Sequence, residues 1–258
     1  MIVEKLSRVV ETDIVRLILR DPVSNVSLAH VSPRDVCEFR DRRLATVKPA
    51  TVCRELCVLQ HAFNVAKREW GLPISSNPVA ATRKPKIENR RDRRLRDNEY
   101  EALLDACSRC RNHLIRPIIT VALETGMRRG ELLSAEWRYL DIEHRTLHLP
   151  HTKNGFARTV PLSPSALTAL QGLDTDHEGR IFPMSKVALK QAWGRLKRRA
   201  GVTDLRFHDF RHEAISRFFE MGLSLPEVAS ISGHRDPRML LRYTHFEAAT
   251  IARKLGGL

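Results

Sequence analysis

The side chains best suited to chemistry fall in four separated segments of this sequence. They are Arg128 in TGMRRGEL, Lys153 in TKNG, His208 and Arg211 in HDFRH, and His234 and Tyr243, which stand nine residues apart. Two guanidiniums can bind the oxygens of an anionic group in a bidentate manner, and a phenol beside a proton acceptor can act as a nucleophile. Each residue alone is more typical of a surface charge or of packing. Their joint occurrence in this order predicts a catalytic site for an anionic substrate.

The overall charge indicates the same kind of partner. Lys and Arg number 44 against 30 Asp and Glu in 258 residues, which gives a formal net charge of +14. Such an excess favours a polyanion, either nucleic acid or an anionic membrane surface. The sequence has no run of 18 apolar residues and no signal-peptide pattern, which argues against the membrane. Five cysteines without a secretion signal are typical of reduced thiols in a cytoplasmic protein.

The elements that must position these residues begin with a predicted helical domain over residues 1–80. Apolar residues recur at helical spacing over residues 1–20. Two further helices are predicted over residues 33–44 and 49–70. Their start signals are Ser32–Pro33 and Lys48–Pro49, in which proline takes the first helical position. Because Met1 falls inside the first helix, we expect this domain to be incomplete at its N-terminal end.

Residues 81–96 are predicted to be a basic linker. Positions 83–96 hold eight basic and two acidic side chains, together with Pro85 and almost no apolar residues. A solvated charge run is one interpretation. In a chain this basic, a segment that follows a phosphate backbone is favoured. The residues expected to make such contacts are Arg83, Lys84, Lys86, Arg90, Arg91, Arg93 and Arg94.

Residues 97–258 are predicted to form a larger, mainly helical domain with one β-hairpin. Apolar residues alternate over 141–149, and a second extended run covers 157–162. Between them lies Asn154–Gly155, the strongest short signal for a hairpin turn. Helical patterns precede the hairpin and follow it, the last of them from Met239 onward. The predicted fold class is therefore mainly α, with a small all-helical domain and a larger helical domain that carries a small β-sheet.

The four segments and their spacing resemble the tyrosine recombinase (phage integrase) family over residues 97–258. The segments EFRDRRLA, PATVCRELCVLQHAFNVAKREWG and NPVAATRKPK are similar to the core-binding domain of that family. HEAISRFFE and ISGH…RYTH resemble shufflon-type DNA invertases, and phage integrases are also similar. The resemblance implies the DNA breaking–rejoining fold, with a SAM-like core-binding domain ahead of the catalytic domain. It also implies that the six residues above form the catalytic set, with no metal, cofactor or ATP.

The resemblance assigns roles that suit these residue types. Tyr243 would attack a phosphodiester and form a 3′-phosphotyrosyl link, which stores the energy of the broken bond. Arg128 and Arg211 would bind the nonbridging oxygens as their charge grows in the transition state. Because a phenol has a pKa near 10, the attack needs a proton acceptor, and His208 is expected to be that base or relay.

The other residues of the set have supporting roles. Lys153, on the hairpin, is expected to protonate the leaving 5′-oxygen, and His234 to donate a hydrogen bond to the phosphate. Glu131 is expected to orient an arginine through a salt bridge. His212 is predicted to be a packing residue, because helix geometry points its side chain away from the helix face that carries Arg211. No metal site is predicted at the C-x-x-C pair of Cys107, because no second pair of ligands follows.

The sequence thus predicts a site-specific recombinase that integrates, excises or inverts DNA. Two alternatives stay open: a catalytically silent DNA-binding accessory protein of the same fold, and a type IB-like topoisomerase. The intact catalytic set argues against the first. The amphipathic tail after Tyr243 argues against the second, because it could dock on a neighbouring subunit. The expected partners are double-stranded DNA, further copies of the chain in a tetrameric synapse with exchanged tails, and accessory proteins, but no membrane.

Overall fold

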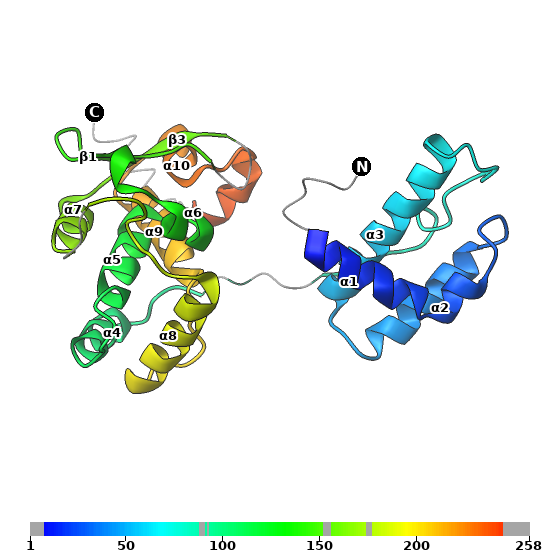
Figure 1. The fold of residues 1–258 in the computed structure, drawn as a ribbon, viewed down its shortest axis with the longest axis horizontal. Coiled ribbons are helices and arrows are strands. Elements are labelled where there is room, and N and C mark those ends of the chain that lie inside the picture. Colours follow the sequence, from blue (N-terminus) through cyan, green and yellow to red (C-terminus); the bar gives the residue numbers. More distant parts are fainter. Residues whose placement is uncertain (1–7, 88–90, 92, 152–155, 174–176, 245–258) are drawn as a thin grey trace, which may run out of the picture. The chain divides into compact units, whose positions relative to one another are not determined.

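The computed structural model describes residues 8–87, 91, 93–151, 156–173 and 177–244. The chain divides into two compact units, residues 1–91 and 92–258 (Figure 1). Helices dominate both units, and the sheet is small, antiparallel and three-stranded. The predicted fold class, mainly α with a small β-sheet, is therefore confirmed.

In its described residues, 8–87 and 91, the N-terminal unit has three α-helices and one 3₁₀ turn. Their bounds are α1 Arg8–Leu19, η1 Pro22–Asn25, α2 Pro33–Leu44 and α3 Pro49–Arg68. The sequence predicted all three α-helices. Helix α2 begins with a capping box, in which the Ser32 hydroxyl accepts from the backbone of Asp35 and the Asp35 carboxylate accepts from the backbone of Ser32. This reciprocal pair satisfies backbone donors that the first helical turn leaves without partners.

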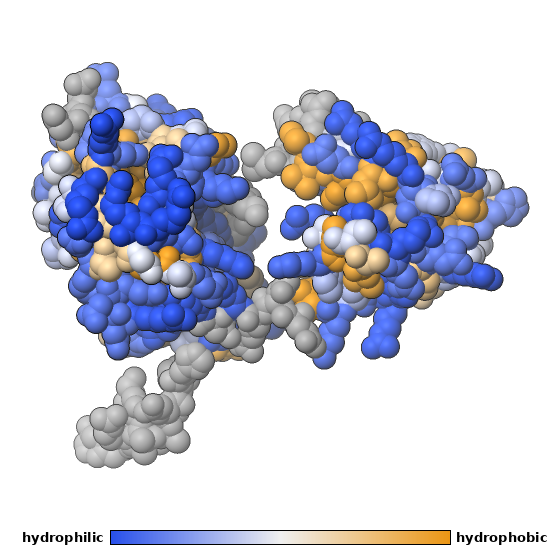
Figure 2. Space-filling view, turned by 90° about the horizontal axis from the view of Figure 1, so that it is seen from below, coloured by the Kyte–Doolittle hydropathy of each residue, from blue (hydrophilic) through white to orange (hydrophobic). Residues whose placement is uncertain are grey.

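Helices α2 and α3 of this unit are joined by apolar packing and by one ion pair. Phe39 of α2 and Leu56 of α3 are fully buried in the same cluster. The carboxylate of Glu55, only 2% exposed, accepts two hydrogen bonds of 2.9 Å from the Arg43 guanidinium. Apolar side chains also reach the surface of this unit, Val9 of α1 among them (Figure 2).

The start of the predicted linker is attached to the N-terminal unit. The Arg83 carbonyl accepts a hydrogen bond of 3.0 Å from Arg40, and the Lys84 ammonium donates one of 2.9 Å to Gln60. The Pro85 carbonyl accepts from the thiol of Cys53 at 3.4 Å. Residues 83–85 therefore follow the surface of the small helical unit.

The C-terminal unit is built around one helix that is buried on most of its sides. Helix α5 carries seven buried residues in eleven and runs through the middle of the unit in Figure 1. It packs against α7 and α9. The helices of this unit are α4 Glu99–Ser108, α5 Ile115–Thr125, α6 Arg129–Ser134, α7 Pro164–Gln171, α8 Lys186–Arg199, α9 Asp209–Glu220 and α10 Leu225–Ser232.

The sheet follows α6 and contains the predicted hairpin. After η2 (Trp137–Tyr139), the strands are β1 Leu140–Asp141, β2 Thr146–Leu149 and β3 Arg158–Pro161, paired antiparallel in the order β1-β2-β3. Leu147 lies opposite Val160, and both are buried. The Asn-Gly turn between β2 and β3 lies outside the described residues. The run predicted as one strand over 141–149 is broken by a turn, in which the Asp141 carboxylate accepts from the backbone of His144.

The helix predicted from Met239 onward is wrong in the described part of the chain. Two 3₁₀ turns occur there, η3 Pro237–Met239 and η4 Leu241–Tyr243. The Asp236 carboxylate caps the first turn by accepting from the backbone of Arg238. Leu240, between the two turns, is fully buried in a cluster with α9 and α10. This anchor holds the segment of Tyr243 against α9.

The end of α5 depends on a glycine. Gly126 has a φ of +60°, and its amide closes the helix by donating to the carbonyl of Ala122. A Cβ atom at this position would stand 3.3 Å from the Cβ of Ala214 on α9. Glycine is thus required both for the left-handed conformation and for the close approach of α5 to α9.

This double requirement gives a stability prediction. Gly201 has a similar φ of +66° with no atom within 4 Å of an added Cβ, so it isolates the backbone cost. We expect Gly201→Ala to lower the free energy of unfolding by about 1 kcal/mol. Gly126→Ala should lose roughly 1–3 kcal/mol more, because α9 must shift.

The measurement is unfolding in urea, monitored by tryptophan fluorescence, with all variants made in a Trp70→Phe background. The remaining tryptophans, Trp137 and Trp193, both lie in the core of the C-terminal unit, so the signal reports that unit. Equal losses for the two alanine variants would show that the contact with Ala214 carries no strain.

Candidate active site

The segment between α5 and α6 positions Arg128. It follows Gly126 and the buried Met127, and it is the N-cap residue directly before α6. Its amide donates to one carboxylate oxygen of Glu131 and its Nη1 to the other, both at 2.9 Å. The predicted salt bridge from Glu131 to an arginine is therefore present, and it orients the side chain of Arg128.

Glu131 also binds a second arginine, Arg158, which the sequence analysis did not single out. The guanidinium of Arg158, at the start of β3, donates to the two carboxylate oxygens at 3.1 and 2.8 Å. Glu131 is only 3% exposed, and burial alone would raise its pKa. The hydrogen bonds and charge of Arg158, followed by those of Arg128, outweigh burial and lower the pKa to about 2. Glu131 is therefore a carboxylate at neutral pH.

Arg211 lies deeper than the other arginines of the site. It is 4% exposed on α9, and it donates hydrogen bonds of 2.6 Å to the carbonyls of Gly126 and Ser232. Its Nη2 also lies 3.4 Å from the Nε2 of His234. Burial, followed by the charge of Arg128, lowers the pKa of Arg211 to about 9.

The end of α10 supplies acceptors for all three arginines. Nε of Arg158 donates to the Ile231 carbonyl at 3.0 Å, and Nη2 of Arg128 lies 3.4 Å from the Gly233 carbonyl. With the bond from Arg211 to Ser232, three successive carbonyls accept from three different guanidiniums. The last carbonyls of a helix have no partner within the helix and carry partial negative charge, so cations are favoured there.

Gly233 is required at this helix end for a steric reason. Its φ is +69°, and an added Cβ would stand 2.9 Å from Nη1 of Arg158. The sequence therefore ends α10 with the one residue that lets the guanidinium lie against the backbone.

His234 follows this glycine and is fixed by its neighbours. Its Nδ1 lies 2.7 Å from the Ser232 hydroxyl. Burial, then the charges of Arg211 and Arg128, lowers the pKa of His234 to about 4, so the imidazole is neutral at pH 7. A neutral imidazole has one N–H donor, which suits the predicted hydrogen bond to an anion.

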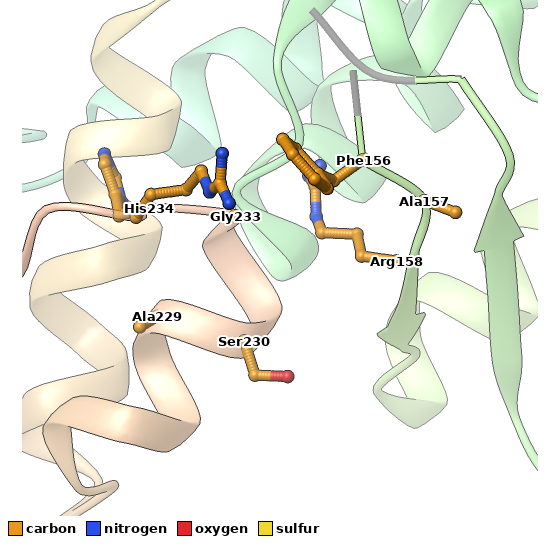
Figure 3. A pocket seen from close by; sticks show the side chains of 8 residues that line it. Phe156, Ala157, Arg158, Ala229, Ser230, Gly233 and His234 are labelled. Carbon is orange, nitrogen blue, oxygen red and sulfur yellow. The ribbon is translucent and has the colours of Figure 1, made fainter. Parts of the chain in front are cut away.

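A cavity of about 200 Å³ lies beside His234, between α10 and the segment that leads into β3. Figure 3 shows Phe156 and Arg158 reaching from this segment toward α10 and the loop of His234. The guanidinium of Arg235 stacks on the Phe156 ring at 3.7 Å. The cavity wall is thus basic and partly aromatic.

Tyr243 lies against α9 through a contact that the sequence analysis did not predict. Nδ1 of His212 is 2.5 Å from the phenolic oxygen, and the two rings stack with centroids 5.7 Å apart. The prediction that His212 only packs is therefore wrong. It does face away from Arg211, but Tyr243 of η4 approaches that other face.

His208 stands one turn before His212. Their rings meet edge to face with centroids 5.1 Å apart, as residues four apart on a helix can. Packed neighbours desolvate the imidazole of His208, and together with the charge of Arg211 they lower its pKa. This spacing of two histidines was the sequence signal that could have pointed to His212.

The structure brings together five of the six predicted catalytic residues and the predicted Glu131. Lys153 lies outside the described residues, and so does Arg90 of the linker set. Arg93 and Arg94 are bound within the C-terminal unit: Arg93 pairs with Glu99, and Arg94 with Glu213 and Glu220. Arg158 had no sequence signal of its own, because an arginine at a strand start is ordinary.

Over the described ranges, no three His, Cys, Asp or Glu side chains are grouped so that they could hold a metal ion. Within the same ranges, no helix has the length and apolar character needed to cross a membrane.

Comparison with protein families gives a clear result. The model of the phage integrase family matches residues 93–249. The chain therefore belongs to the phage integrase family, the class that the arginines, histidines and tyrosine of this site indicate.

Individual proteins agree with this membership. The shufflon-specific DNA recombinase of Escherichia coli is 42% identical over 248 residues, which cover 93% of this chain and 64% of that protein. The chain thus spans less than two thirds of that relative's length. The Tn1549 transposon integrase in complex with a circular intermediate DNA has a TM-score of 0.80 at 18% identity, covering 99% and 95% of the two chains. A lambda integrase tetramer bound to a Holliday junction has a TM-score of 0.77 at 22% identity, covering 93% and 72%.

The shared carboxylate leads to a prediction about pH. The pKa of Glu131 is lowered from 4.5 to about 2 by folding, so its ionised form stabilises the fold above pH 4.5. That contribution, about 3 kcal/mol, should disappear as the pH falls from 4.5 to 2. Glu131→Gln should therefore be less stable than the parent at pH 7, and the gap should narrow as the pH approaches 2.

Urea unfolding at a series of pH values, in the Trp70→Phe background, measures this gap. Glu143→Gln removes an exposed carboxylate and serves as the matched control, with a gap near zero throughout. A gap for Glu131→Gln that stays constant between pH 4.5 and 2 would contradict the role of its charge.

Proposed function

We propose that this protein is a site-specific DNA recombinase that cleaves and rejoins DNA strands through Tyr243. One observation carries the proposal: Arg128 and Arg158 pair with the single carboxylate of Glu131, while the buried Arg211 donates to backbone carbonyls and interacts electrostatically with Tyr243. The surplus positive charge needs an anion, and a phosphodiester beside a phenol provides both the anion and the reacting atom. Membership of the phage integrase family supports this reading.

In the proposed reaction, the groups that bind the phosphate are held in position before the transition state forms. Arg128 and Arg211 bind the nonbridging oxygens of the scissile phosphate, and His234 donates a hydrogen bond to one of them. Because these groups are already held by Glu131 and by backbone carbonyls, little reorganisation is needed when negative charge grows in the transition state. Tyr243 attacks the phosphorus and forms the 3′-phosphotyrosyl link.

Release of the 5′-oxygen needs a proton, because an alkoxide is a poor leaving group. We assign this step to Lys153, in the segment of the sequence between β2 and β3, as the family resemblance implies. A 5′-hydroxyl from a partner strand then attacks the phosphotyrosyl link, so no ATP and no metal takes part in the overall exchange.

The proposed partners are double-stranded DNA and further copies of the chain. The complexes of the Tn1549 and lambda integrases support this assignment. We assign residues 1–80 to a core-binding domain, 81–96 to the linker and 97–258 to the catalytic domain. Exchange of the tail after Tyr243 and a role for accessory proteins belong to the same proposal, and the tail lies outside the described residues. Action in the cytoplasm, on phage or plasmid DNA, follows from the substrate.

The linker contribution to DNA binding is proposed for its exposed basic residues. Arg83, Lys84 and Lys86 are exposed, so their charges can reach phosphates. Arg93 is half-buried against Glu99, and its pairing limits it to positioning the chain. Inversion is the favoured outcome of the reaction, on the strength of the shufflon-specific relative.

The nucleophile assignment predicts the behaviour of Tyr243→Phe. Loss of the hydroxyl should abolish covalent adduct formation, while DNA affinity stays within about twofold because shape and charge are kept. The measurement is adduct trapping on nicked suicide duplexes taken from the DNA that flanks the coding region, with gel-shift titration in parallel. Tyr139→Phe, which removes another phenol of the same unit, is the control. An adduct formed by Tyr243→Phe would refute the assignment.

The leaving-group assignment predicts a rescue. Lys153→Ala should slow cleavage of ordinary DNA by about 100-fold or more. A duplex with sulfur in place of the bridging 5′-oxygen has a leaving group that needs no proton, so the rate should return to near the parent value. Single-turnover cleavage of the two duplexes measures this difference. If Lys153→Ala slows both equally, another residue is the acid.

A further inference from the structure

We propose that His212 is the proton acceptor that activates Tyr243, a role that the sequence analysis expected of His208. This inference rests on the proposed strand cleavage by Tyr243 and names the residue that makes the phenol nucleophilic. The geometry supports it directly, since Nδ1 of His212 lies 2.5 Å from the phenolic oxygen. At this distance the two atoms share one hydrogen, with the hydroxyl as donor.

The surroundings keep His212 in its neutral form, the form that has a lone pair to accept a proton. Burial, followed by the nearby His208 and Arg242, lowers the pKa of His212 to about 4. The imidazole is therefore neutral at pH 7, and its Nδ1 carries a lone pair when the hydrogen is on Nε2. The groups that face it are His208, Asp209 and Arg211 of α9, Arg242 and Tyr243 of η4, and His234 after α10.

The fold explains why His212 rather than His208 meets the phenol. Leu240 is buried under α9 and α10, so η4 crosses the side of α9 that His212 occupies. The stacked rings fix the phenol beside Nδ1. His208 instead meets the His212 ring edge to face, with the ring centroids 5.1 Å apart.

The proposed step balances in protons and electrons. The O–H bond of Tyr243 breaks, its hydrogen passes to Nδ1 of His212, and the oxygen pair forms the bond to phosphorus. The bond from phosphorus to the 5′-oxygen breaks, and that oxygen takes a proton from Lys153. On rejoining, the 5′-hydroxyl returns its proton to Lys153, and the departing Tyr243 oxygen takes its proton back from His212.

The test uses His212→Asn in the full chain. The Oδ1 of Asn can stand where Nδ1 stood and still accept the hydrogen bond, but it cannot take the proton at neutral pH. We expect adduct formation on the nicked suicide duplex to fall about 100-fold or more, with DNA affinity unchanged. Thermal unfolding of the variant checks that the fold is kept.

A pH profile separates proton transfer from a structural role. Between pH 7 and 8.5 the parent rate should be nearly flat, because His212 is already neutral. The His212→Asn rate should rise about tenfold per pH unit, because a phenol with a pKa near 10 must then ionise by itself. The duplex with a 5′-bridging sulfur should not rescue His212→Asn, although it rescues Lys153→Ala.

His208→Asn, one turn earlier on α9, is the matched control and should keep the flat profile. The proposal is overturned if His208→Asn shows the rising profile and His212→Asn does not, or if His212→Asn cleaves at the parent rate.

A measurement without DNA keeps this inference separable from the proposed function. In ¹⁵N NMR of the free protein, Tyr243→Phe should shift the Nδ1 resonance of His212 and leave that of the exposed His144 unchanged. An unmoved His212 resonance would refute the contact. If the parent forms no adduct on any of the duplexes, strand cleavage is refuted, whatever the NMR result for the contact.

Discussion

Arginine binding by the last carbonyls of α10 is the interaction on which the rest of the site depends. Ile231, Ser232 and Gly233 present successive carbonyl oxygens, and each accepts from a different guanidinium. These acceptors belong to the backbone, so they require a helix that ends at this point and a glycine that leaves room. The end of α10 thus supplies negative partial charge to three guanidiniums, in addition to the charge of the Glu131 carboxylate.

The same arrangement connects parts of the chain that are far apart in sequence. Arg211 of α9 binds the ends of both α5 and α10, and Glu131 joins the start of α6 to the start of β3. The close approach of α5 to α9 at Gly126 and the burial of Leu240 then determine where the arginines and Tyr243 lie. Packing and polar contacts therefore depend on each other in this unit. A shift of α9 would move Arg211 away from its carbonyl partners and His212 away from Tyr243.

Sequence patterns predicted the elements of this fold well, for physical reasons that are local. The capping box at Ser32, the prolines that open α2 and α3, and the alternation across the hairpin act over a few residues. The helix expected from Met239 onward was not found, because the apolar spacing there reflects one buried leucine in a chain of 3₁₀ turns. Local spacing cannot distinguish these two cases.

The residue types of the site were predictable, but its pairings were not, apart from the salt bridge between Glu131 and an arginine. A motif of arginines, histidines and a tyrosine is visible along the chain, whereas the partner of each is set by tertiary contacts. His212 faces away from Arg211, as helix geometry predicts, yet another segment meets it there. Arg158 gains its importance from tertiary contacts, with Glu131 27 positions earlier in the chain and with the carbonyl of Ile231.

The lowered pKa of Arg211 has a consequence for how this protein is held together. A guanidinium that is buried beside Arg128 destabilises the folded chain until an anion neutralises the repulsion. Any anion that binds the folded state alone must stabilise it through thermodynamic linkage. Under the proposed function DNA is that anion, and resistance to heat and proteolysis then becomes a property of the protein–DNA complex.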